Sequence, residues 1–519
     1  MVTPVQIEIH AGSLLAVNEE PGCLSEASVH SKRTQVAALM TRLRQDHDAA
    51  EPELSQQEQC AILAQLKVFG RTVAGSDAIY APDGITLLCE IGLRADTPEP
   101  SREALRCVAN AMLLDRTTTK AFTDGGYMQR ASEAYKSESP DDEFLLGRIL
   151  FLSTTHATDI DLIQTCVNEH KLAENAHAAI ARHAAAYKAA STDSLTPVPQ
   201  MQAMALPETL KLLFTLTSKL SDNDLFVKTI PHLLDILHTI PLQTPALQPP
   251  VTHIIDALSN IHLDNDAAKA AFFPSGEDAD QTTHVSRVIT VLDRATQAAA
   301  GSSSISRVAD DFDDRGASTL KLLHDLYPLA PEPVQEFMRT SLLPSDTERN
   351  MPLGSQTSAT LPARLLRLSS APTASNTRSL LLTLLFTLSD SHAGKFIRNI
   401  GYGHASGYLM MRGIPIPEDV LAEAGYATDA SGRQVNPITG QHLDDEDRNV
   451  RASGLEGLEG MTDEEKEREA ERLFVLFERL NRTGVVSVEN PLRQAVQEGR
   501  FEELQSSPDD SDDEDDGKA

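Results

Sequence analysis

The residue patterns that come nearest to a nucleotide-binding site in this sequence are two glycine-containing segments. Gly394-Lys395 has the Gly-Lys pair of a phosphate-binding loop. The upstream glycine is missing, because Ser389 stands there, and Phe396 replaces the Ser or Thr that would bind Mg²⁺. Gly401-Tyr402-Gly403, with Gly407, contains part of a dinucleotide-binding fingerprint, but the spacing is wrong and no strand precedes it. Neither segment therefore predicts a nucleotide site.

Three histidines, His170, His177 and His183, lie in one alanine-rich helical segment. No two of them are three or four residues apart, and two helical turns put His170 and His177 about 10 Å apart along the axis, too far for one metal ion. We expect ordinary surface histidines, with no metal and no cofactor. The sequence also has no nucleophile elbow. These patterns favour a protein that acts by binding other proteins, and they do not indicate an enzyme.

The composition of the 519-residue chain favours helices over strands. Aromatic residues make up 4% and Trp is absent, whereas strands draw on aromatic and β-branched residues. The formal net charge is −31, from 76 acidic and 45 basic residues. Because a chain this acidic repels the phosphate backbone, we exclude nucleic acid as a partner and expect partners with basic or amphipathic surfaces.

The cysteines are few, widely spaced and without a C-x-x-C pair, which is typical of reduced core thiols. They are Cys23, Cys60, Cys89, Cys107 and Cys166. The first residues lack the basic and apolar regions of a signal peptide, and no stretch of about 18 apolar residues predicts a membrane span. We therefore expect a cytoplasmic monomer that can be recruited to the cell cortex or the plasma membrane.

Leucine-rich segments of similar composition recur along the chain and predict its architecture. They begin at Glu103, Glu143, Glu208 and His253, which are 40, 65 and 45 residues apart. Armadillo or HEAT repeats of about 40 to 47 residues give such spacings when one insertion lies between them. Several segments are apolar all round, which is typical of helices packed between neighbours. We predict an all-α, armadillo- or HEAT-like superhelical solenoid over residues 1–426, with a compact multi-helix bundle as the alternative.

The composition changes after the predicted solenoid. Residues 427–460 are rich in Gly, Asp and Asn and predict a flexible linker. Residues 461–482 predict an amphipathic helix, because Thr462 and Glu465 form a capping box and the apolar stripe includes Phe474 and Phe477. The stripe must be buried, either on the last repeat or on a partner that the helix clamps. Residues 483–519 predict an acidic, largely disordered tail.

Several segments together resemble the synembryn family. KFIRNIGYGHASGYLMMRG, at 395–413, is similar to a family signature; NPITG at 436–440 and EGMTDEEKEREAERLFVLFERL from Glu459 follow in the family's order. EALRCVANAM, FLLGRILFLSTTH and ETLKLLFTLT resemble family repeat helices. The resemblance implies a guanine nucleotide exchange factor and folding chaperone for G-protein α subunits. It would bind the GDP-bound or nascent subunit, promote GDP release, and hold the nucleotide-free state until GTP binds.

The resemblance also implies where the α subunit binds. The concave face of the solenoid would take the subunit's C-terminal helix, and the helix at 461–482 would contact its nucleotide-binding domain. Because a C-terminal helix ends in a carboxylate, the groove needs cations and amide donors. The residues expected to contact the partner are Lys67, Arg71, Asn110, Arg148, Lys211, Phe214, Arg398, Tyr402, His404, Phe474 and Phe477. For each basic residue a solvated helix edge is the alternative, and for Phe214 it is plain core.

Two other functions are compatible with the same features: an armadillo-type scaffold, or a holdase chaperone without exchange activity. An importin-like scaffold is excluded, because its concave ladder needs Trp and the chain has none. In the tail, Ser506, Ser507 and Ser511 each have an acidic residue three positions on, which suits an acid-directed kinase of the casein kinase type. We expect phosphorylation at these serines; a merely solubilising acidic tail is the alternative.

Overall fold

The computed structural model describes residues 26–192, 197–276, 279–300, 312–313, 315–349, 360–370, 375–417, 427–428 and 434–435. The chain divides into two units, Met1–Val420 and Leu421–Ala519. The described part of the first unit consists of helices and their connections. Within the described ranges no helix is long and apolar enough to cross a membrane.

The first half of this unit contains both long and short helices. They are α1 (Glu26–Asp48), α2 (Gln56–Phe69), α3 (Asp77–Tyr80), α4 (Pro82–Gly92), α5 (Pro98–Leu114), α6 (Thr117–Asp124), α7 (Tyr127–Ala134), α8 (Pro140–His156), α9 (Ile160–Asn168), α10 (Leu172–Thr192) and α11 (Gln200–Lys219).

The second half continues the same pattern with shorter helices. They are η2 (Asp224–Thr229), α12 (Ile230–Thr239), α13 (Val251–Asn260), α14 (Asp266–Phe272), α15 (Thr283–Ala300), α17 (Ala317–Leu326), η3 (Tyr327–Leu329), α18 (Glu332–Leu342), α19 (Asp346–Arg349), α20 (Leu361–Leu368), α21 (Ser375–Leu388), α22 (Ala393–Ile400) and α23 (Tyr402–Met411).

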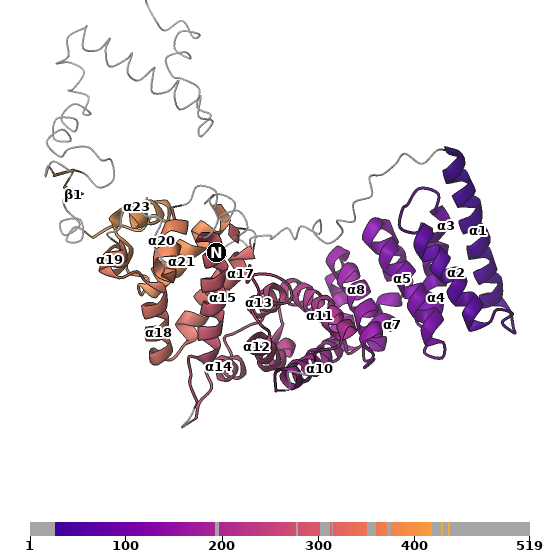
Figure 1. Cartoon of the computed structure of the whole chain (residues 1–519), viewed down its shortest axis with the longest axis horizontal. Helices are drawn as coiled ribbons and strands as arrows, with labels where there is room; N and C mark the ends of the chain where they lie inside the picture. Colours follow the sequence, from indigo (N-terminus) through magenta and orange to yellow (C-terminus); the bar gives the residue numbers. More distant parts are fainter. Residues whose placement is uncertain are drawn as a thin grey trace, which may run out of the picture. The chain divides into compact units, whose positions relative to one another are not determined.

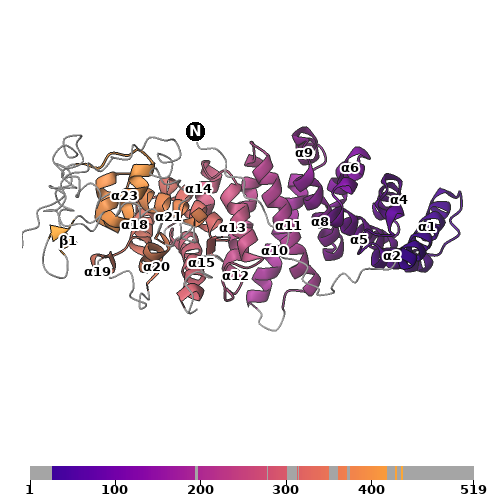
Figure 2. The same ribbon diagram turned by 90° about the horizontal axis from the view of Figure 1, so that it is seen from above.

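One set of helices forms a continuous ladder along the unit. In this set α2 packs on α5, α5 on α8, α8 on α11, α11 on α13, α13 on α17 and α17 on α21. The first three begin at Gln56, Pro98 and Pro140, a step of 42 residues each time. Figures 1 and 2 show the helices stacked along the unit, with α1 at one end and α23 near the other. Packing between successive repeats is the signature of a solenoid, so the predicted all-α solenoid is confirmed.

Local sequence signals explain where the ladder helices begin. Ser55 caps α2 through a capping box: its hydroxyl accepts from the Glu58 backbone N–H, and the Glu58 carboxylate accepts from the Ser55 backbone N–H. Proline opens both α5 and α8, where its missing N–H costs nothing because the first turn has no intrahelical acceptor. These signals determine where each helix begins, and the apolar side chains of each helix determine which side faces the core.

The core runs along the whole unit and is dominated by leucine. On α11, for example, Leu206, Leu210, Leu213 and Leu216 are fully buried. This helix packs against α8 on one side and α13 on the other, as predicted for a helix that is apolar nearly all round. The thiols Cys89, Cys107 and Cys166 are also buried in the core, and Cys60 is partly buried.

The described residues of the second unit form one short antiparallel pair of strands. β1 (Ala427–Thr428) pairs with β2 (Gln434–Val435), and Ala427 lies opposite Val435. This pair falls within the predicted linker at 427–460. The predicted helix at 461–482 and the predicted tail at 483–519 lie outside the described residues.

Candidate functional site

Along the middle turns of α5, α8 and α11, only a narrow stripe of side chains contacts solvent. On α5 the stripe contains Arg106, Asn110 and Leu113; on α8 it contains Phe144, Arg148 and Phe151; on α11 it contains Lys211 and Phe214. Their spacing of three and four residues places the members of each stripe on one side of their helix. Together with Lys67 on α2, we call these residues the stripe face. Four of the residues predicted from sequence (Asn110, Arg148, Lys211 and Phe214) therefore lie on these stripes.

The amino-terminal part of the stripe face is a row of ion pairs that links three helices. Lys67 Nζ lies 2.8 Å from Glu103 Oε2, and Arg106 Nη1 lies 2.6 Å from Glu103 Oε1. Arg106 also approaches Asp141 on α8, at 3.7 Å. Glu103 thus contacts one cation from α2 and one from its own helix. Lys67, which was predicted to bind a partner, is already paired.

A second cluster links α8 to α11 in the same way. Arg148 donates a hydrogen bond of 2.8 Å to Glu208 Oε1. Lys211 Nζ lies 2.7 Å from Glu208 Oε2 and forms an ion pair with it, without the geometry of a hydrogen bond. The guanidinium of Arg148 stacks 4.8 Å above the Phe144 ring, and Lys211 lies 5.0 Å above Phe151. Burial lowers the pKa of Lys211, and the charge of Glu208 partly opposes this shift.

These contacts change the expected chemistry of the face. The sequence prediction supplied unpaired cations for an incoming carboxylate, but three of them are ion-paired with Glu103 or Glu208. Sequence reasoning missed both glutamates, although the signal was present: each lies three residues before a cation, Arg106 and Lys211, on the same side of a helix. A partner's carboxylate must compete with these two acids. The rings Phe144, Phe151 and Phe214 offer apolar contact beside them.

Arg71 differs from the other predicted cations. It follows the end of α2, is exposed, and forms no ion pair within the described part of the chain. The exposed apolar side chains Val68 and Val73, with 56% and 43% of their surface in solvent, lie on either side of it in sequence. A cation flanked by apolar surface suits a side chain or chain terminus that carries both a carboxylate and apolar groups.

The carboxyl-terminal predicted residues lie on a different group of helices. Arg398 is exposed on α22, Tyr402 opens α23, and His404 is partly buried on the first turn of α23. The His404 ring is bonded to the hydroxyl of Ser370, with Nδ1 2.9 Å from Oγ, and burial lowers its pKa. At Gly401, between the two helices, φ is 87° and ψ is 150°, a conformation that L side chains rarely adopt.

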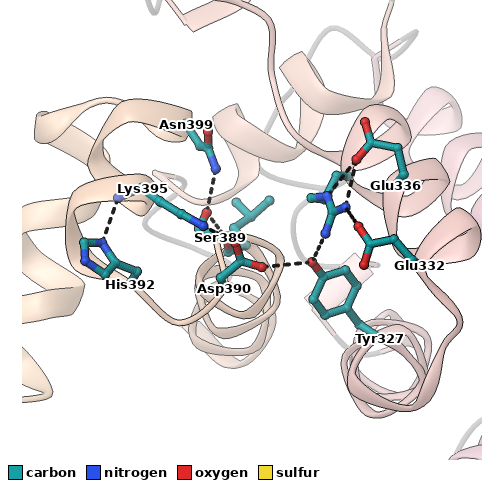
Figure 3. A network of polar contacts seen from close by, with 10 residues as sticks. Tyr327, Glu332, Glu336, Ser389, Asp390, His392, Lys395 and Asn399 are labelled. Carbon is teal, nitrogen blue, oxygen red and sulfur yellow. Dashed lines mark hydrogen bonds and ion pairs between the residues drawn. The ribbon is translucent and has the colours of Figure 1, made fainter.

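A polar network holds α22 in place (Figure 3). Asp390, which follows α21 in a left-handed conformation with φ of 57°, is ion-paired with Lys395 of α22. Asn399 donates to the Ser389 hydroxyl over 2.9 Å. The Tyr327 hydroxyl donates a hydrogen bond of 3.4 Å to Asp390 and accepts one from Arg339. Arg339 is also ion-paired with Glu332 and Glu336 of α18. The beginning of the signature-like segment is thereby fixed to the two preceding repeats.

The structure thus divides the predicted residues between two places in the first unit. Lys67, Asn110, Arg148, Lys211 and Phe214 belong to the stripe face, with Arg71 just past the end of α2, whereas Arg398, Tyr402 and His404 belong to α22 and α23. Phe474 and Phe477, with the serines Ser506, Ser507 and Ser511, lie outside the described residues. Whether any of them contacts a partner stays a prediction.

The prediction that His170, His177 and His183 all lie on the surface is wrong for His183, which is fully buried on α10. His183 Nε2 lies 2.6 Å from Glu143 Oε1, and Glu143 also accepts from Thr209 and pairs with Arg182. The cluster joins α8, α10 and α11. The sequence signal was the apolar period of α10, since His183 falls on the same side as Ala176 and Ile180.

A family of known proteins matches most of the chain. The family model described as guanine nucleotide exchange factor synembryn matches residues 62–500. This chain belongs to the synembryn family. The match begins within α2 and includes every residue of the stripe face, as well as α22 and α23. The family predicted from the sequence segments is therefore confirmed.

Curated relatives within the synembryn family are named as chaperones. A synembryn-like chaperone of Schizosaccharomyces pombe is 28% identical over 177 residues, which is 32% of this chain and 32% of the relative. Chaperone Ric-8A of Macaca fascicularis is 30% identical over 141 residues, 24% and 25% of the two chains, and that of Danio rerio is 34% identical over 110 residues, 20% and 18%. The matched stretches thus span a third or less of these relatives.

Proposed function

We propose that this synembryn-family chain is a guanine nucleotide exchange factor and folding chaperone for heterotrimeric G-protein α subunits. The observation that carries the proposal is the match of the exchange-factor family model over residues 62–500. The stripe face supports it, because it combines cations, an amide and aromatic rings on helices that are rigidly packed in a ladder. Such a face suits an amphipathic helix that ends in a carboxylate.

The proposed mechanism needs no covalent step. The α subunit's C-terminal helix binds along the stripe face, with its carboxylate near Arg71 and its apolar side chains on the phenylalanine rings. A subunit whose last helix is held in this way has a loosened nucleotide site, and GDP leaves. Because the protein binds the nucleotide-free conformer better than the loaded one, that difference in affinity shifts the population toward the empty state. GTP binding then reverses the preference.

The helix predicted at 461–482 has a second role in this proposal. It clamps the subunit's nucleotide-binding domain through the apolar stripe that contains Phe474 and Phe477, while the segment that includes Arg398, Tyr402 and His404 contributes further contacts. Phosphorylation of Ser506, Ser507 and Ser511 would add about −1.5 to −2 charges at each site and tune the exchange rate. Equal exchange by untreated protein, kinase-treated protein and a triple Ala variant would leave the tail without a regulatory role.

A chaperone without exchange activity is the second candidate, because the relatives that match are named chaperones. A binding experiment with purified α subunits tests what both candidates share. We expect a stable complex with the nucleotide-free subunit, a weaker one with the GDP form, and release on addition of a GTP analogue. If no α subunit of a broad panel forms a complex, both candidates are wrong.

A further inference from the structure

Two histidines from successive repeats meet where α12 packs against α15. His238 lies in the last turn of α12, and His284 is the second residue of α15. His238 Nε2 is 3.0 Å from His284 Nδ1, and the ring planes are inclined at 69° with their centroids 5.0 Å apart. Both rings are partly exposed, so a small ion can reach them from solvent. Neither residue belongs to the stripe face or to α22 and α23.

The separation of these two nitrogens matches that of two ligands on one metal ion. Zn–N bonds to histidine are about 2.0 to 2.1 Å, so two such nitrogens at right or tetrahedral angles lie about 2.9 to 3.4 Å apart. A hydrogen bond between two neutral imidazoles has a similar length, provided that one nitrogen carries a proton and the other does not. A tautomer shift that moves that proton to the other nitrogen of its ring, with a modest ring rotation, would direct both lone pairs at one point.

One cation and one carboxylate lie close to the pair. Burial lowers the pKa of both His238 and His284, and for His238 the neighbouring His284 and Arg287 lower it further. Asp235 acts on both rings in the opposite sense. It is exposed and lies one turn before His238 on α12. The guanidinium of Arg287 is held by the carbonyls that end α12, over 2.9 and 2.6 Å.

We propose that His238 and His284 bind one borderline divalent transition-metal ion, of which Zn²⁺ is the representative. Among the described residues no group of three or more His, Cys, Asp and Glu side chains already surrounds a metal position, so water completes the coordination here. Imidazole nitrogens select Zn²⁺, Cu²⁺ and Ni²⁺ over Mg²⁺. Because the two ligands come from α12 and α15, the ion ties successive repeats together. An ion that binds the folded chain and not the unfolded one stabilises the solenoid.

The metal alone is the probe in the test. Untagged full-length protein is stripped with a chelator, desalted, and its melting temperature is measured with added Zn²⁺, Ni²⁺ or Mg²⁺. We expect Zn²⁺ and Ni²⁺ to raise the melting temperature and Mg²⁺ to leave it unchanged. The variants His238→Gln and His284→Gln should each lose the rise. The matched control is His232→Gln. His232 pairs with His177, with ring centroids 5.3 Å apart, so this variant also loses one member of a histidine pair. It should keep the Zn²⁺-dependent rise in melting temperature.

A melting temperature that Zn²⁺ leaves unchanged in the wild type would overturn the proposal, as would a rise that survives in both Gln variants. If far-ultraviolet circular dichroism shows that a variant does not fold, electron paramagnetic resonance of wild-type protein with one equivalent of Cu²⁺ decides. Coupling to two imidazole nitrogens supports the site. A spectrum without nitrogen coupling contradicts it.

Discussion

Glu103 and Glu208 determine what a bound carboxylate gains on the stripe face. Lys67, Arg148 and Lys211 each contact one of these glutamates. A partner's carboxylate therefore gains binding free energy from these cations only to the extent that its contacts are stronger than the existing ion pairs. Arg71 has no such pair within the described residues. The electrostatic part of partner binding should therefore be concentrated at Arg71, with the phenylalanine rings supplying apolar contact.

Charge reversal at Arg71 tests this distribution. We expect Arg71→Glu to weaken binding of the α subunit's C-terminal peptide by about 1.5 to 3 kcal/mol, the range for a lost charge-assisted contact. The control is Lys188→Glu, an exposed lysine on α10 that is outside the stripe face and should leave affinity unchanged. Isothermal titration calorimetry measures both. Unchanged affinity in a folded Arg71→Glu variant would make Arg71 an ordinary surface residue.

The buried cluster at Glu143 predicts a pH dependence. Burial raises the pKa of Glu143. The hydrogen bond and charge of His183, together with Thr209 and Arg182, lower this pKa by more, so that it lies below the ordinary value of 4.5. The unfolded chain therefore binds the proton more tightly, so this carboxylate stabilises the fold fully above about pH 4.5 and progressively less as the pH falls through its folded pKa.

The variant Glu143→Gln should lose about 3 kcal/mol of unfolding free energy at neutral pH, because it removes the carboxylate that pairs with Arg182 and bonds to the buried side chains of His183 and Thr209. The difference between wild type and variant should shrink as the pH is lowered below 4.5. Urea unfolding at a series of pH values measures it. Glu133→Gln, which alters an exposed pair with His170, is the control and should show a small difference throughout. A pH-independent difference for Glu143→Gln would contradict the assignment.

At the scale of elements, the junction between α22 and α23 depends on one glycine. Gly401 has φ of 87° and ψ of 150°, so we expect Gly401→Ala to cost about 1 to 3 kcal/mol of stability. Gly407 is the matched control: it lies inside α23, and a Cβ there would meet no atom within 4 Å. Gly407→Ala should therefore stabilise the protein by about 0.5 to 1 kcal/mol. Equal effects of the two substitutions in urea unfolding would show that the junction is not strained.

The elements also show what could be predicted from sequence. The leucine-rich stretches from Glu103, Glu143 and Glu208 became α5, α8 and α11, because helices buried on both sides carry an unbroken apolar signal. The partners of Lys67 and Arg148 could not be assigned in this way. Each pair joins residues of different repeats, and which acid a long side chain reaches depends on how the helices are rotated and packed. For Glu103 and Glu208 themselves, the sequence offered only their spacing of three residues to Arg106 and Lys211.

At the scale of the whole molecule, the proposed clamp predicts a separation of functions. A chain that ends at residue 460 keeps every described helix and the core that joins them. Its melting temperature should stay close to that of the full chain, and it should bind the α subunit's C-terminal peptide with unchanged affinity. Its exchange rate should fall, because the predicted helix at 461–482 is missing. Normal exchange, or a greatly lowered melting temperature, would contradict the clamp.

The central claim concerns nucleotide exchange, and the rate of GDP release tests it most directly. Purified α subunits are loaded with labelled GDP, and release is followed with and without the full-length chain in excess GTP. The account predicts faster release from at least one α subunit, increasing with protein concentration until the complex is saturated, and a smaller effect with Arg71→Glu. An α subunit that forms a complex but releases GDP at its unassisted rate, across the whole panel, would contradict exchange activity and leave a chaperone.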